Sequence, residues 1–488
     1  MEITYLNNAI ELTKVVFDSR EVVSGSLFVA VKGLATDGHN FIDKAIESGA
    51  TTIVCETMPT KNIEGIKYIV VEHSDKALAQ IASLFYGEPS KKLKLVGVTG
   101  TNGKTTTATL LYDLFTRMGH KVGLISTVVY KVIEEQFVAS HTTPDSVRLN
   151  SLLAMMVEKG CDYCFMEVSS HSICQNRIES LHFAGGIFTN ITHDHLDYHG
   201  TFAEYIKAKK RFFDELPKNA FAIYNGDDKN GKVMMQNCKA SVKSFALTSG
   251  ADYKCKIIES LMGSMLLRID TKEVWVKFIG KFNAYNLLGV YAAAMELGAD
   301  RDTLLLDMSM LTSVAGRFEY VISTNGITAI IDYAHTPDAL ENVLKTIEEV
   351  RTPSQRIITV VGCGGNRDKT KRPEMAQIAA QMSDFTIFTS DNPRNELPEE
   401  ILSDMTAGLK SSDICYQGKY LVVTDRREAI GAAVAMAHGV SLEKIERGEM
   451  GDIILIAGKG HETYQEIKGV RTHFDDKEQI NERFSNIK

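Results

Sequence analysis

One short segment, VGVTGTNGKTT at 96–106, combines the residue types of a phosphate-binding loop. Its glycines free backbone N–H groups to wrap an anion, and the start of the following helix adds a favourable dipole. A lysine then reaches the outer phosphates, and a threonine hydroxyl can serve Mg²⁺. The spacing departs from the usual loop pattern, because Val98 stands where its first glycine is expected. We predict nucleotide contacts from Gly100, Thr101, Asn102, Gly103, Lys104, Thr105 and Thr106.

Two further polar segments follow apolar runs that are typical of strands. MEVSSHSICQNR places Glu167 at the end of one run, and FTNITHDHLDYHG places His195 among other histidines and aspartates after the next. Open α/β sheets hold ligands at the carboxyl ends of their strands. A carboxylate, an imidazole and a loop threonine could therefore hold Mg²⁺ against nucleotide phosphates. The alternatives are histidines that only cap strands, and a zinc site, which oxygen ligands and a nucleotide disfavour.

Composition narrows the class of protein. The chain has 488 residues and a net charge of −8, which suits a globular protein of several domains and argues against a general nucleic-acid binder. Residues 1–20 lack the pattern of a signal peptide and no apolar run is long enough for a membrane span, so we expect a cytoplasmic protein. Scattered cysteines fit reduced thiols. Cys161 and Cys164 have the spacing of a zinc or redox pair, but CDYCFMEV is typical of an apolar strand.

The apolar and glycine patterns predict an α/β protein of three domains. A small N-terminal α/β domain, residues 1–89, ends at the linker-like GEPSKK. Residues 90–311 alternate strands and helices, which predicts a central parallel-sheet ATPase domain with the P-loop, and additional antiparallel strands near its end. Residues 312–488 form a second, Rossmann-like alternation. Its predicted strands, each followed by a helical stretch, are ITAIIDY, RIITVVG, DFTIFTS, YLVVT and DIILIAG.

A series of motifs then extends along nearly the whole chain. In order they are GVTGTNGKTT, HTTPD (141–145), MEVSSH, DHLDYHG, GKFNAYN (280–286), GRFE (316–319), DYAHTPD (332–338), GCGGNRDKTKRP (362–373), DNPR (391–394) and AGKGHE (457–462). With these motifs in this order, the chain resembles the Mur ligase family. The resemblance implies an ATP- and Mg²⁺-dependent, amide-forming ligase of peptidoglycan precursor synthesis, which acts as a monomer on small molecules.

The resemblance also implies a mechanism. The acceptor carboxylate, here that of the D-Glu of UDP-N-acetylmuramoyl-L-alanyl-D-glutamate, attacks the γ-phosphate of ATP. The amine of an incoming amino acid then displaces phosphate from the acyl phosphate, because phosphorylation supplies the leaving group that a carboxylate lacks. By position, the catalytic residues implied are Lys104, Glu167, His195, Lys209 and Arg317. Thr105, Glu167, His195 and Lys209 would hold Mg²⁺, with Lys209 as a carbamate.

Substrate contacts follow from the same resemblance. Asn283, Asn286 and Arg317 would contact ATP, and Phe17 and Ser19 the uridine diphosphate. The muramoyl peptide would meet Thr142, Thr143, Ser169, Gln175 and Arg177. The pocket for meso-diaminopimelate would consist of Arg367, Asp391, Asn392, Pro393, Arg394, Gly458 and Glu462.

The pocket suits a diamino acid with a far carboxylate. Arg394 and Arg367 can pair with that carboxylate, and Glu462 and Asn392 can take the far ammonium. L-lysine lacks the carboxylate and would leave Arg394 unpaired. The alternatives are L-lysine or meso-lanthionine as the added amino acid, a folylpolyglutamate synthetase, and a catalytically silent ATP-binding scaffold. The separate N-terminal domain and DNPR argue against the synthetase, and Lys104, Glu167, His195 and Lys209 argue against the scaffold.

Overall fold

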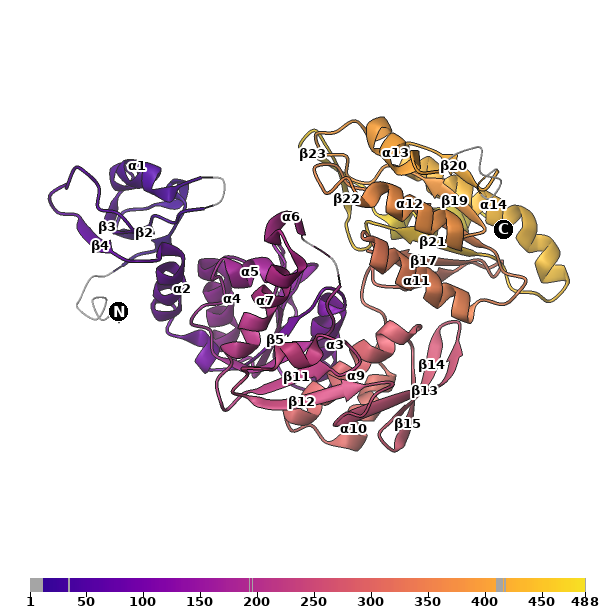
Figure 1. Ribbon diagram of the computed structural model, residues 1–488, viewed down its shortest axis with the longest axis horizontal. Helices are drawn as coiled ribbons and strands as arrows, with labels where there is room; N and C mark the ends of the chain where they lie inside the picture. The colour runs from indigo at the N-terminus through magenta and orange to yellow at the C-terminus, as the bar shows by residue number, and fades with distance from the viewer. Residues whose placement is uncertain are drawn as a thin grey trace. The chain divides into compact units, whose positions relative to one another are not determined.

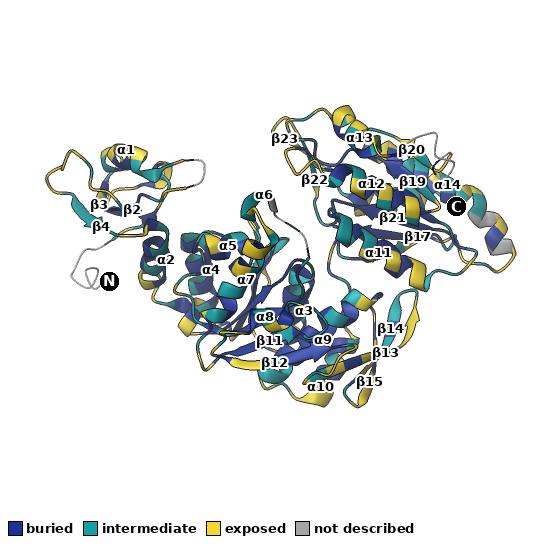
Figure 2. Ribbon diagram, in the orientation of Figure 1, coloured by how far each residue is buried: buried dark blue, intermediate teal, exposed yellow. Residues whose placement is uncertain are grey.

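The structure is a computed structural model that describes residues 12–33, 36–192, 194, 196–409, 416 and 418–487. Contacts divide the chain into two compact units. The first contains the residues up to 100, Thr107–Thr189 and Ala203–Ser244, and the second contains Thr101–Thr106, Asn190–Phe202 and the residues from Phe245 onward. Figure 1 labels the helices and strands, and Figure 2 shows that the sheets of both units are largely buried.

The first unit begins with a four-stranded parallel sheet in the order β1-β2-β3-β4. Its strands are β1 (Val15–Val16), β2 (Ser26–Val29), β3 (Ala50–Cys55) and β4 (Lys67–Val70). Alternate residues of β2 point to opposite faces, so Phe28 packs with α1 (Ile42–Glu47) and Leu27 packs with α2 (Ser74–Phe85). This sheet with its helices confirms the predicted α/β character of the N-terminal part of the chain.

The linker-like segment GEPSKK is packed. It contains the short 3₁₀ helix η4 (Pro89–Lys91), in which Pro89 and Ser90 are buried. The Ser90 hydroxyl accepts a hydrogen bond from the backbone N–H of His182 at 3.0 Å. This connection is thus tied to the sheet that follows it, although its composition is typical of an exposed linker.

A second sheet completes the first unit and is parallel at its centre. Its strands run in the order β11-β10-β5-β9-β6-β7-β8, with β5 between β10 and β9. They are β5 (Lys94–Thr99), β6 (Val122–Ile125), β7 (Val129–Val132), β8 (Glu135–Val138), β9 (Tyr163–Glu167), β10 (Phe183–Phe188) and β11 (Phe221–Asn225). The helices of this part are α3 (Lys104–Arg117), α4 (Ser146–Glu158), α5 (Ser170–Cys174), α7 (Phe202–Asp214) and α8 (Gly231–Met234). The predicted parallel strands are confirmed, and β7 and β8 form an antiparallel edge.

The second unit contains the predicted antiparallel strands. β13 (Tyr253–Leu261), β14 (Ser264–Ile269) and β15 (Lys272–Val276) pair antiparallel, and β13 also pairs with the end of β12 (Ser241–Ala246). α9 (Lys281–Glu296) and α10 (Arg301–Ser309) follow these strands. α6 (Leu196–His199) belongs to the same unit.

A six-stranded sheet forms the rest of the second unit, in the order β16-β17-β21-β18-β19-β20. Its strands are β16 (Glu319–Ile322), β17 (Thr328–Asp332), β18 (Ile357–Val361), β19 (Phe385–Phe388), β20 (Tyr420–Val422) and β21 (Ile453–Ala457). One face packs against α11 (Pro337–Val350), α12 (Lys371–Met382) and α13 (Pro398–Thr406), and the other against α14 (Arg426–Glu446) and α15 (Asp476–Asn486). The strands predicted from the apolar runs are confirmed.

Two features of this sheet differ from the prediction. β16 pairs antiparallel with β17, and a hairpin of β22 (Tyr464–Ile467) and β23 (Val470–His473) follows β21 where we expected a helix. Lys468 and Gly469 connect the hairpin strands with φ values of 50° and 78°. Two consecutive residues with positive φ are typical of a tight type I′ turn, which joins two strands in place of a helix.

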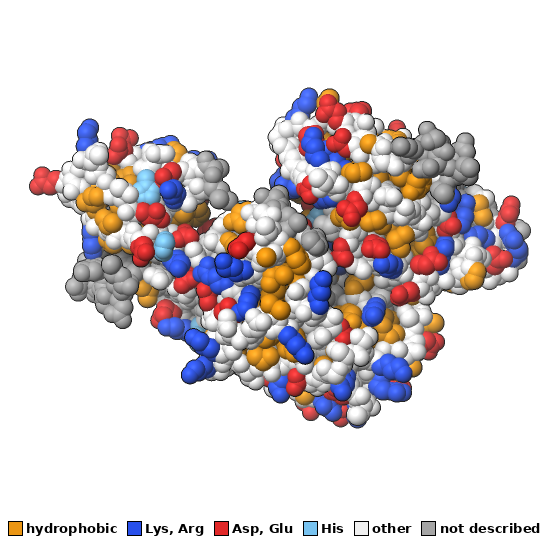
Figure 3. Space-filling model, in the orientation of Figure 1, with side chains coloured by type: hydrophobic (Ala, Val, Ile, Leu, Met, Phe, Trp, Pro, Cys, Tyr) orange, Lys and Arg blue, Asp and Glu red, His pale blue; other side chains and the backbone are white. Residues whose placement is uncertain are grey.

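The surface carries charges of both signs. On the face drawn in Figure 3, lysine and arginine side chains are interspersed with aspartate and glutamate. Within the described part of the chain, no helix is both long enough and apolar enough to cross a membrane.

Candidate active site

The loop between β5 and α3 is tightly organised. Lys104, the first residue of α3, donates from Nζ to the backbone oxygen of Thr101 at 2.8 Å. The Thr101 and Asn102 backbone N–H groups donate to the backbone and side-chain oxygens of Asn190, at 2.8 and 2.9 Å. Gly103 has a φ of +84°, which favours glycine. The loop therefore has the fixed backbone that an anion-binding turn requires.

Two asparagines of α9 lie beneath this loop. Asn283 donates to the backbone oxygen of Ile279 at 2.9 Å, and Asn286 donates to Oδ1 of Asn283 at 3.4 Å. Both side chains are buried. A Cβ on Gly103 would lie only 2.4 Å from Oδ1 of Asn286, so this position has no room for a side chain. The structure thus brings Asn286 against the predicted phosphate loop.

Residues from the third predicted domain also reach the loop. Arg317 donates from Nη2 to the hydroxyl of Thr105 at 3.2 Å, and its guanidinium lies 4.3 Å from the centroid of the Tyr333 ring. Asp338, at the start of α11, accepts from Asn102 at 3.0 Å. Thr105 and Arg317, which were predicted separately as site residues, are therefore in contact. Asp338 received no role in the prediction, although it lies in the DYAHTPD motif.

Glu167 ends β9 in the first unit and is fully buried. Its Oε1 accepts from the backbone N–H of Thr127 at 2.6 Å. Its Oε2 has no hydrogen-bond partner within the described residues. A buried carboxylate oxygen without a donor needs a compensating group, and a divalent cation with oxygen ligands fits that need.

Lys209 lies on α7 and is 1% exposed. Its Nζ donates to the backbone oxygen of Gly100 at 2.8 Å and lies 4.8 Å from the centroid of the Tyr205 ring. Lys209 lies in the basic segment KAKKR of α7, and such a segment usually forms a solvated helix face. Its side chain is nevertheless buried and contacts Gly100, which directly follows β5. His195, the remaining residue of the predicted Mg²⁺ set, lies outside the described residues.

Residues predicted to contact the muramoyl peptide form one network with the end of β9. Thr143 donates to the backbone oxygen of Glu167 at 2.8 Å and accepts from the backbone N–H of Ser169 at 3.2 Å. Arg177 donates to the backbone oxygen of Thr143 at 2.7 Å and to Oε1 of Gln175 at 2.6 and 3.0 Å. Thr143 thus links Arg177 and Ser169 to the backbone of Glu167 at the end of β9.

Three more predicted contacts lie at the margins of that unit. Thr142 accepts at its hydroxyl from the hydroxyl of Thr127 at 3.1 Å, next to the Glu167 network. Phe17 and Ser19 lie between β1 and β2 in the N-terminal sheet. Phe17 is 39% exposed and Ser19 is buried at the start of the 3₁₀ helix η2 (Ser19–Glu21). An exposed aromatic ring there is available to stack on a flat ligand.

The residues predicted to hold the amino acid follow three adjacent parallel strands. Arg367 follows β18, residues 391–394 follow β19, and Gly458 and Glu462 follow β21. These strands are neighbours in the order β21-β18-β19. Because the carboxyl ends of parallel strands meet at one edge of the sheet, the structure brings this predicted set together.

One side of this pocket is cationic. Arg394 has a φ of +53° and donates from Nη1 to the backbone oxygen of Gly365 at 2.9 Å. A Cβ on Gly364 would lie 2.9 Å from that same Nη1 and 3.9 Å from Cγ of Arg367. The two arginine side chains therefore flank one glycine, and Arg367 is exposed to solvent.

The other side is anionic. Asn392 donates from Nδ2 to Oε2 of Glu462 at 2.7 Å. Asp391 is 7% exposed, and its Oδ1 has no hydrogen-bond partner within the described residues. Burial raises the pKa of Glu462, and the nearby carboxylate of Asp391 raises it further. A Cβ on Gly458, which has a φ of +114°, would lie 3.2 Å from Oδ2 of Asp391. The carboxylates of the buried Asp391 and the partly buried Glu462 thus form this side, and a side chain at position 458 would crowd Asp391.

Lys459 is a residue of this pocket that the sequence did not reveal. It is fully buried, and its Nζ donates to Oδ1 of Asn392 at 3.2 Å and lies 3.5 Å from Oε2 of Glu462. Its only signal was its place between Gly458 and Glu462 in AGKGHE. A lysine in a glycine-rich segment is ordinarily expected in solvent.

Comparison with known proteins identifies the family. Three family models match the chain: Mur ligase family, catalytic domain, over residues 11–86; Mur ligase middle domain over 98–294; and Mur ligase, glutamate ligase domain, over 316–460. The chain is also 56% identical over 476 residues to a protein of Parabacteroides distasonis named UDP-N-acetylmuramoyl-L-alanyl-D-glutamate–2,6-diaminopimelate ligase, and this covers 98% of the chain and 95% of that relative. The chain belongs to the Mur ligase family.

Solved structures agree with the Mur ligase assignment. A structure of UDP-N-acetylmuramoyl-L-alanyl-D-glutamate–2,6-diaminopimelate ligase matches with a TM-score of 0.67 and 30% identity, over 97% of this chain and 95% of the other. A Thermotoga maritima Mur ligase (MurF) solved in complex with ADP matches with a TM-score of 0.62, over 97% of each chain, and its 21% identity shows a shared fold. The predicted α/β fold in three domains is confirmed, while the boundaries of those domains stay a prediction.

Proposed function

We propose that this Mur ligase uses ATP to join meso-diaminopimelate to the D-Glu carboxylate of UDP-N-acetylmuramoyl-L-alanyl-D-glutamate. The observation that carries the proposal is the pocket at the ends of β18, β19 and β21. There, two arginine side chains lie beside Gly364, and the carboxylates of the buried Asp391 and the partly buried Glu462 lie next to Asn392. This pairing fits an amino acid whose far end carries both a carboxylate and an ammonium group. The 56% identity to a relative named for this reaction supports the same substrates.

The loop after β5 would hold the nucleotide. Lys104 and the backbone N–H groups of the loop would bind the phosphates, with Asn283 and Asn286 on the side of the adenine. The acceptor carboxylate would attack the γ-phosphate, and the amine of the amino acid would then displace phosphate from the acyl phosphate. Arg317, which already contacts Thr105, would bind the phosphoryl group as its charge develops.

Glu167 offers a buried oxygen that has no hydrogen-bond partner within the described residues, and such an oxygen suits Mg²⁺. By the family resemblance, Thr105, His195 and Lys209, the latter as a carbamate, would complete the Mg²⁺ set. Bound Mg²⁺ would offset the charge of ATP and acceptor as the two anions approach. An unmodified lysine ammonium would repel that cation, which is the electrostatic reason for the carbamate.

The acceptor would bind along the first unit. Phe17 and Ser19 would contact the uridine diphosphate, and the Thr143 network with Thr142, Ser169, Gln175 and Arg177 would contact the muramoyl peptide. All three substrates are small molecules. We place the reaction in the cytoplasm, with the protein acting as a monomer.

Phosphate release tests the ligase proposal. The purified protein receives ATP, Mg²⁺ and UDP-N-acetylmuramoyl-L-alanyl-D-glutamate, with meso-diaminopimelate, L-lysine or meso-lanthionine offered separately and the product confirmed by mass. We expect release that requires both the acceptor and an amino acid, with diaminopimelate preferred. Phosphate release in the absence of the acceptor or of an amino acid would contradict a ligase and favour an ATPase. If no phosphate were released with any of the three amino acids, that would also contradict a ligase and would favour a scaffold.

The arginine pair gives a sharper test of the amino acid. Arg394→Ala should lower kcat/KM for diaminopimelate about 10- to 100-fold, the range expected when a hydrogen bond to a charged group is lost. The use of L-lysine, which has no far carboxylate, should not change. Arg447→Ala removes a 60% exposed arginine paired with Glu443 and serves as the control. An equal loss for both amino acids would contradict the assigned role of Arg394.

A further inference from the structure

Two buried lysines lie at opposite ends of the same strand, β21. Lys444 contacts Asp452, which directly precedes the strand, and Lys459 lies just beyond its last residue, Ala457. Both side chains are at most 7% exposed. A buried ammonium needs ion pairs or hydrogen bonds to offset the loss of hydration. Lys444 and Lys459 differ in their hydrogen-bond and ion-pair partners, and this difference indicates the role of each lysine.

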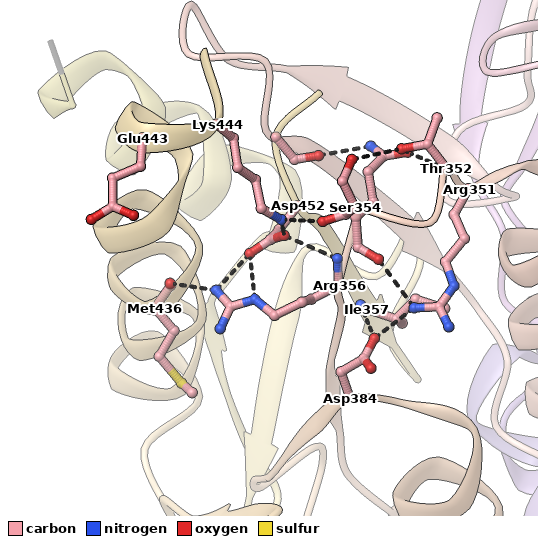
Figure 4. Close-up of polar contacts among 12 residues, drawn as sticks. Arg351, Thr352, Ser354, Arg356, Ile357, Asp384, Met436, Glu443, Lys444 and Asp452 are labelled. Atoms are coloured by element: carbon pink, nitrogen blue, oxygen red, sulfur yellow. Dashed lines mark hydrogen bonds and ion pairs between the residues drawn. The ribbon is translucent and has the colours of Figure 1, made fainter. Parts of the chain in front are cut away.

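The Lys444 cluster at the amino end is complete. Lys444 and Arg356 converge on the fully buried carboxylate of Asp452, as Figure 4 shows. Arg356 donates to it from Nε at 2.9 Å, from Nη2 at 2.6 Å and from its backbone N–H at 3.0 Å. Lys444 donates to Asp452 and also to the backbone oxygen of Ser354. Every charge here has a partner within the protein, so the cluster stabilises the fold and leaves nothing for a ligand.

The cluster at the carboxyl end is incomplete. Lys459 donates to the backbone oxygen of Tyr464 and to Oδ1 of Asn392. Its Nζ lies 3.5 Å from Oε2 of Glu462 and 3.6 Å from Oδ1 of Asp391. The Asp391 oxygen has no hydrogen-bond partner within the described residues. A buried acceptor that has an ion pair with a shared cation but no hydrogen bond marks a place where a donor from outside the protein would bind.

Lys459 also fixes an amide. Oδ1 of Asn392 accepts from Lys459 at 3.2 Å and from the backbone N–H of Glu466 at 2.9 Å. Because both neighbours are donors, the amide nitrogen must face Glu462, to which it donates at 2.7 Å. The remaining lone pairs of Glu462 and Oδ1 of Asp391, which accepts no hydrogen bond within the described residues, are then available to one further donor.

The charges of the pocket lead to the same conclusion. Asp391 and Glu462 carry two negative charges when ionised, and Lys459 supplies one positive charge. The other buried cation nearby, Arg426, is paired with Asp476 through hydrogen bonds of 2.8 and 2.7 Å. One negative charge is therefore left, and it matches one ammonium group. Without Lys459 the excess would be two charges, which a low-dielectric site disfavours.

We propose that Lys459 is a positioning residue that orients Asn392 and sets the pocket charge, so that Asp391 and Glu462 accept the far ammonium of the amino acid. The inference rests on the proposed function for the identity of that amino acid. It predicts that Lys459 governs recognition of the far ammonium and has little effect on recognition of the far carboxylate.

The experiment compares two amino acids. L-2-aminopimelate keeps the reacting amine and the far carboxylate of diaminopimelate but lacks the far amine. In Lys459→Met, the ratio of kcat/KM for diaminopimelate to that for 2-aminopimelate should fall about 10- to 100-fold. Lys459→Arg keeps the charge and should keep most of the ratio. The ratio does not depend on the active fraction, so partial misfolding cannot mimic the effect.

Lys444→Met is the matched control. It also removes a buried lysine paired with a carboxylate, but at the other end of β21. It should lower stability and leave the substrate ratio unchanged. If Lys459→Met does not fold, Lys459→Gln, which can still donate to Asn392 but carries no charge, takes its place. A ratio that is unchanged in the Lys459 variant, or that falls equally in Lys444→Met, would overturn the proposal.

The pH profile separates charge from shape. The charged and titratable groups that face Glu462 are Asp391, Lys459, Arg426, Tyr333 and Tyr464. Burial raises the pKa of Glu462 and Lys459 opposes that rise, so removing Lys459 should raise this pKa further. In Lys459→Met the ratio should therefore recover as pH rises, while the wild-type ratio changes less. A parallel pH dependence in both proteins would mean that Lys459 acts only through packing.

Calorimetry distinguishes this proposal from the ligase proposal. Titrating the same proteins with the two amino acids, with ADP and the UDP-muramoyl acceptor present, gives a binding ratio without turnover. Absence of wild-type turnover together with a binding ratio that falls in Lys459→Met would contradict the ligase and support the role of Lys459. An unchanged binding ratio would overturn that role even if the ligase is active. A wild-type protein that does not discriminate between the two amino acids would overturn the role of Lys459 and leave the ligase to the turnover test.

Discussion

The ion pair between Arg426 and Asp476 permits a quantitative prediction, because both side chains are fully buried. Asp476 accepts from Nε of Arg426 at 2.8 Å and from Nη2 at 2.7 Å. Asp476→Asn keeps the shape of the side chain but removes its charge. The new amide nitrogen must also face an arginine nitrogen, so one donor opposes another. Arg426 would then keep a buried charge without its counter-ion.

The expected loss of stability follows from these contacts. Each charge-assisted hydrogen bond contributes about 1.5–3 kcal/mol, so two of them give about 3–6 kcal/mol. Breaking a buried ion pair by removing one partner typically costs about 3–5 kcal/mol, which agrees with that range. Native domains are stable by only about 5–15 kcal/mol. Asp476→Asn should therefore remove a large share of the stability of the domain that contains α14 and α15.

Native-state hydrogen exchange is the appropriate assay, because a protein of several domains need not unfold in one step. Peptides from α15 and the start of α14 should lose about 3–5 kcal/mol of protection free energy. The control, Glu341→Gln, breaks an exposed pair with Lys345 and should change protection by at most about 0.5 kcal/mol.

A second variant tests the cause of that loss. The double variant Arg426→Met and Asp476→Leu removes both charges and should be less destabilised than Asp476→Asn alone. A loss below about 1 kcal/mol in Asp476→Asn would refute the assignment of a tightly coupled buried pair. The same conclusion would follow if the double variant were as unstable as the sum of two single losses.

Two further predictions concern the loop and acid stability. Gly103→Ala should raise KM for ATP at least about tenfold, because its Cβ would lie 2.4 Å from Oδ1 of Asn286. The control, Gly119→Ala, has a similar φ of +88° and open space around it, so it should not change KM. Similar KM values in both variants would contradict this prediction. Arg372 lowers the pKa of Glu396 from 4.5 to about 2. Because the folded-state pKa is depressed, the stability from this pair is present above pH 4.5 and is lost as pH falls toward about 2. Glu396→Gln should flatten the pH dependence of the urea midpoint in that range, and an unchanged slope would contradict the assignment.

The strands of the parallel sheets could be predicted because they are buried on both faces. Such strands are near-continuous apolar runs, as in β18 and β21, and these runs stand out in the sequence. The hairpin after β21 could not be predicted in this way. β22 and β23 are half-buried or exposed, so their sequence lacks a strong apolar pattern, and their turn depends on the conformations of Lys468 and Gly469.

The candidate site was predicted unevenly for a related reason. Glycine, lysine and threonine in close sequence indicated the phosphate loop, because its chemistry is local. The contact of Arg317 with Thr105 depends on tertiary packing, and only the family resemblance had placed Arg317 in the ATP site. The burial of Lys459 left no local signal at all. Sequence does not distinguish a solvated lysine from one that is enclosed by the ends of three strands.

The two ends of β21 suggest a way to make that distinction from structure. At its amino end the carboxylate of Asp452 receives all its hydrogen bonds from Arg356 and Lys444. At its carboxyl end Lys459 is shared among several oxygens, and Asp391 keeps an oxygen without a hydrogen-bond partner in the described chain. Ligands of parallel sheets bind at carboxyl ends, so the incomplete cluster lies where a ligand is expected. A buried lysine with saturated partners therefore indicates a structural role, and one beside an unsatisfied carboxylate indicates a binding site.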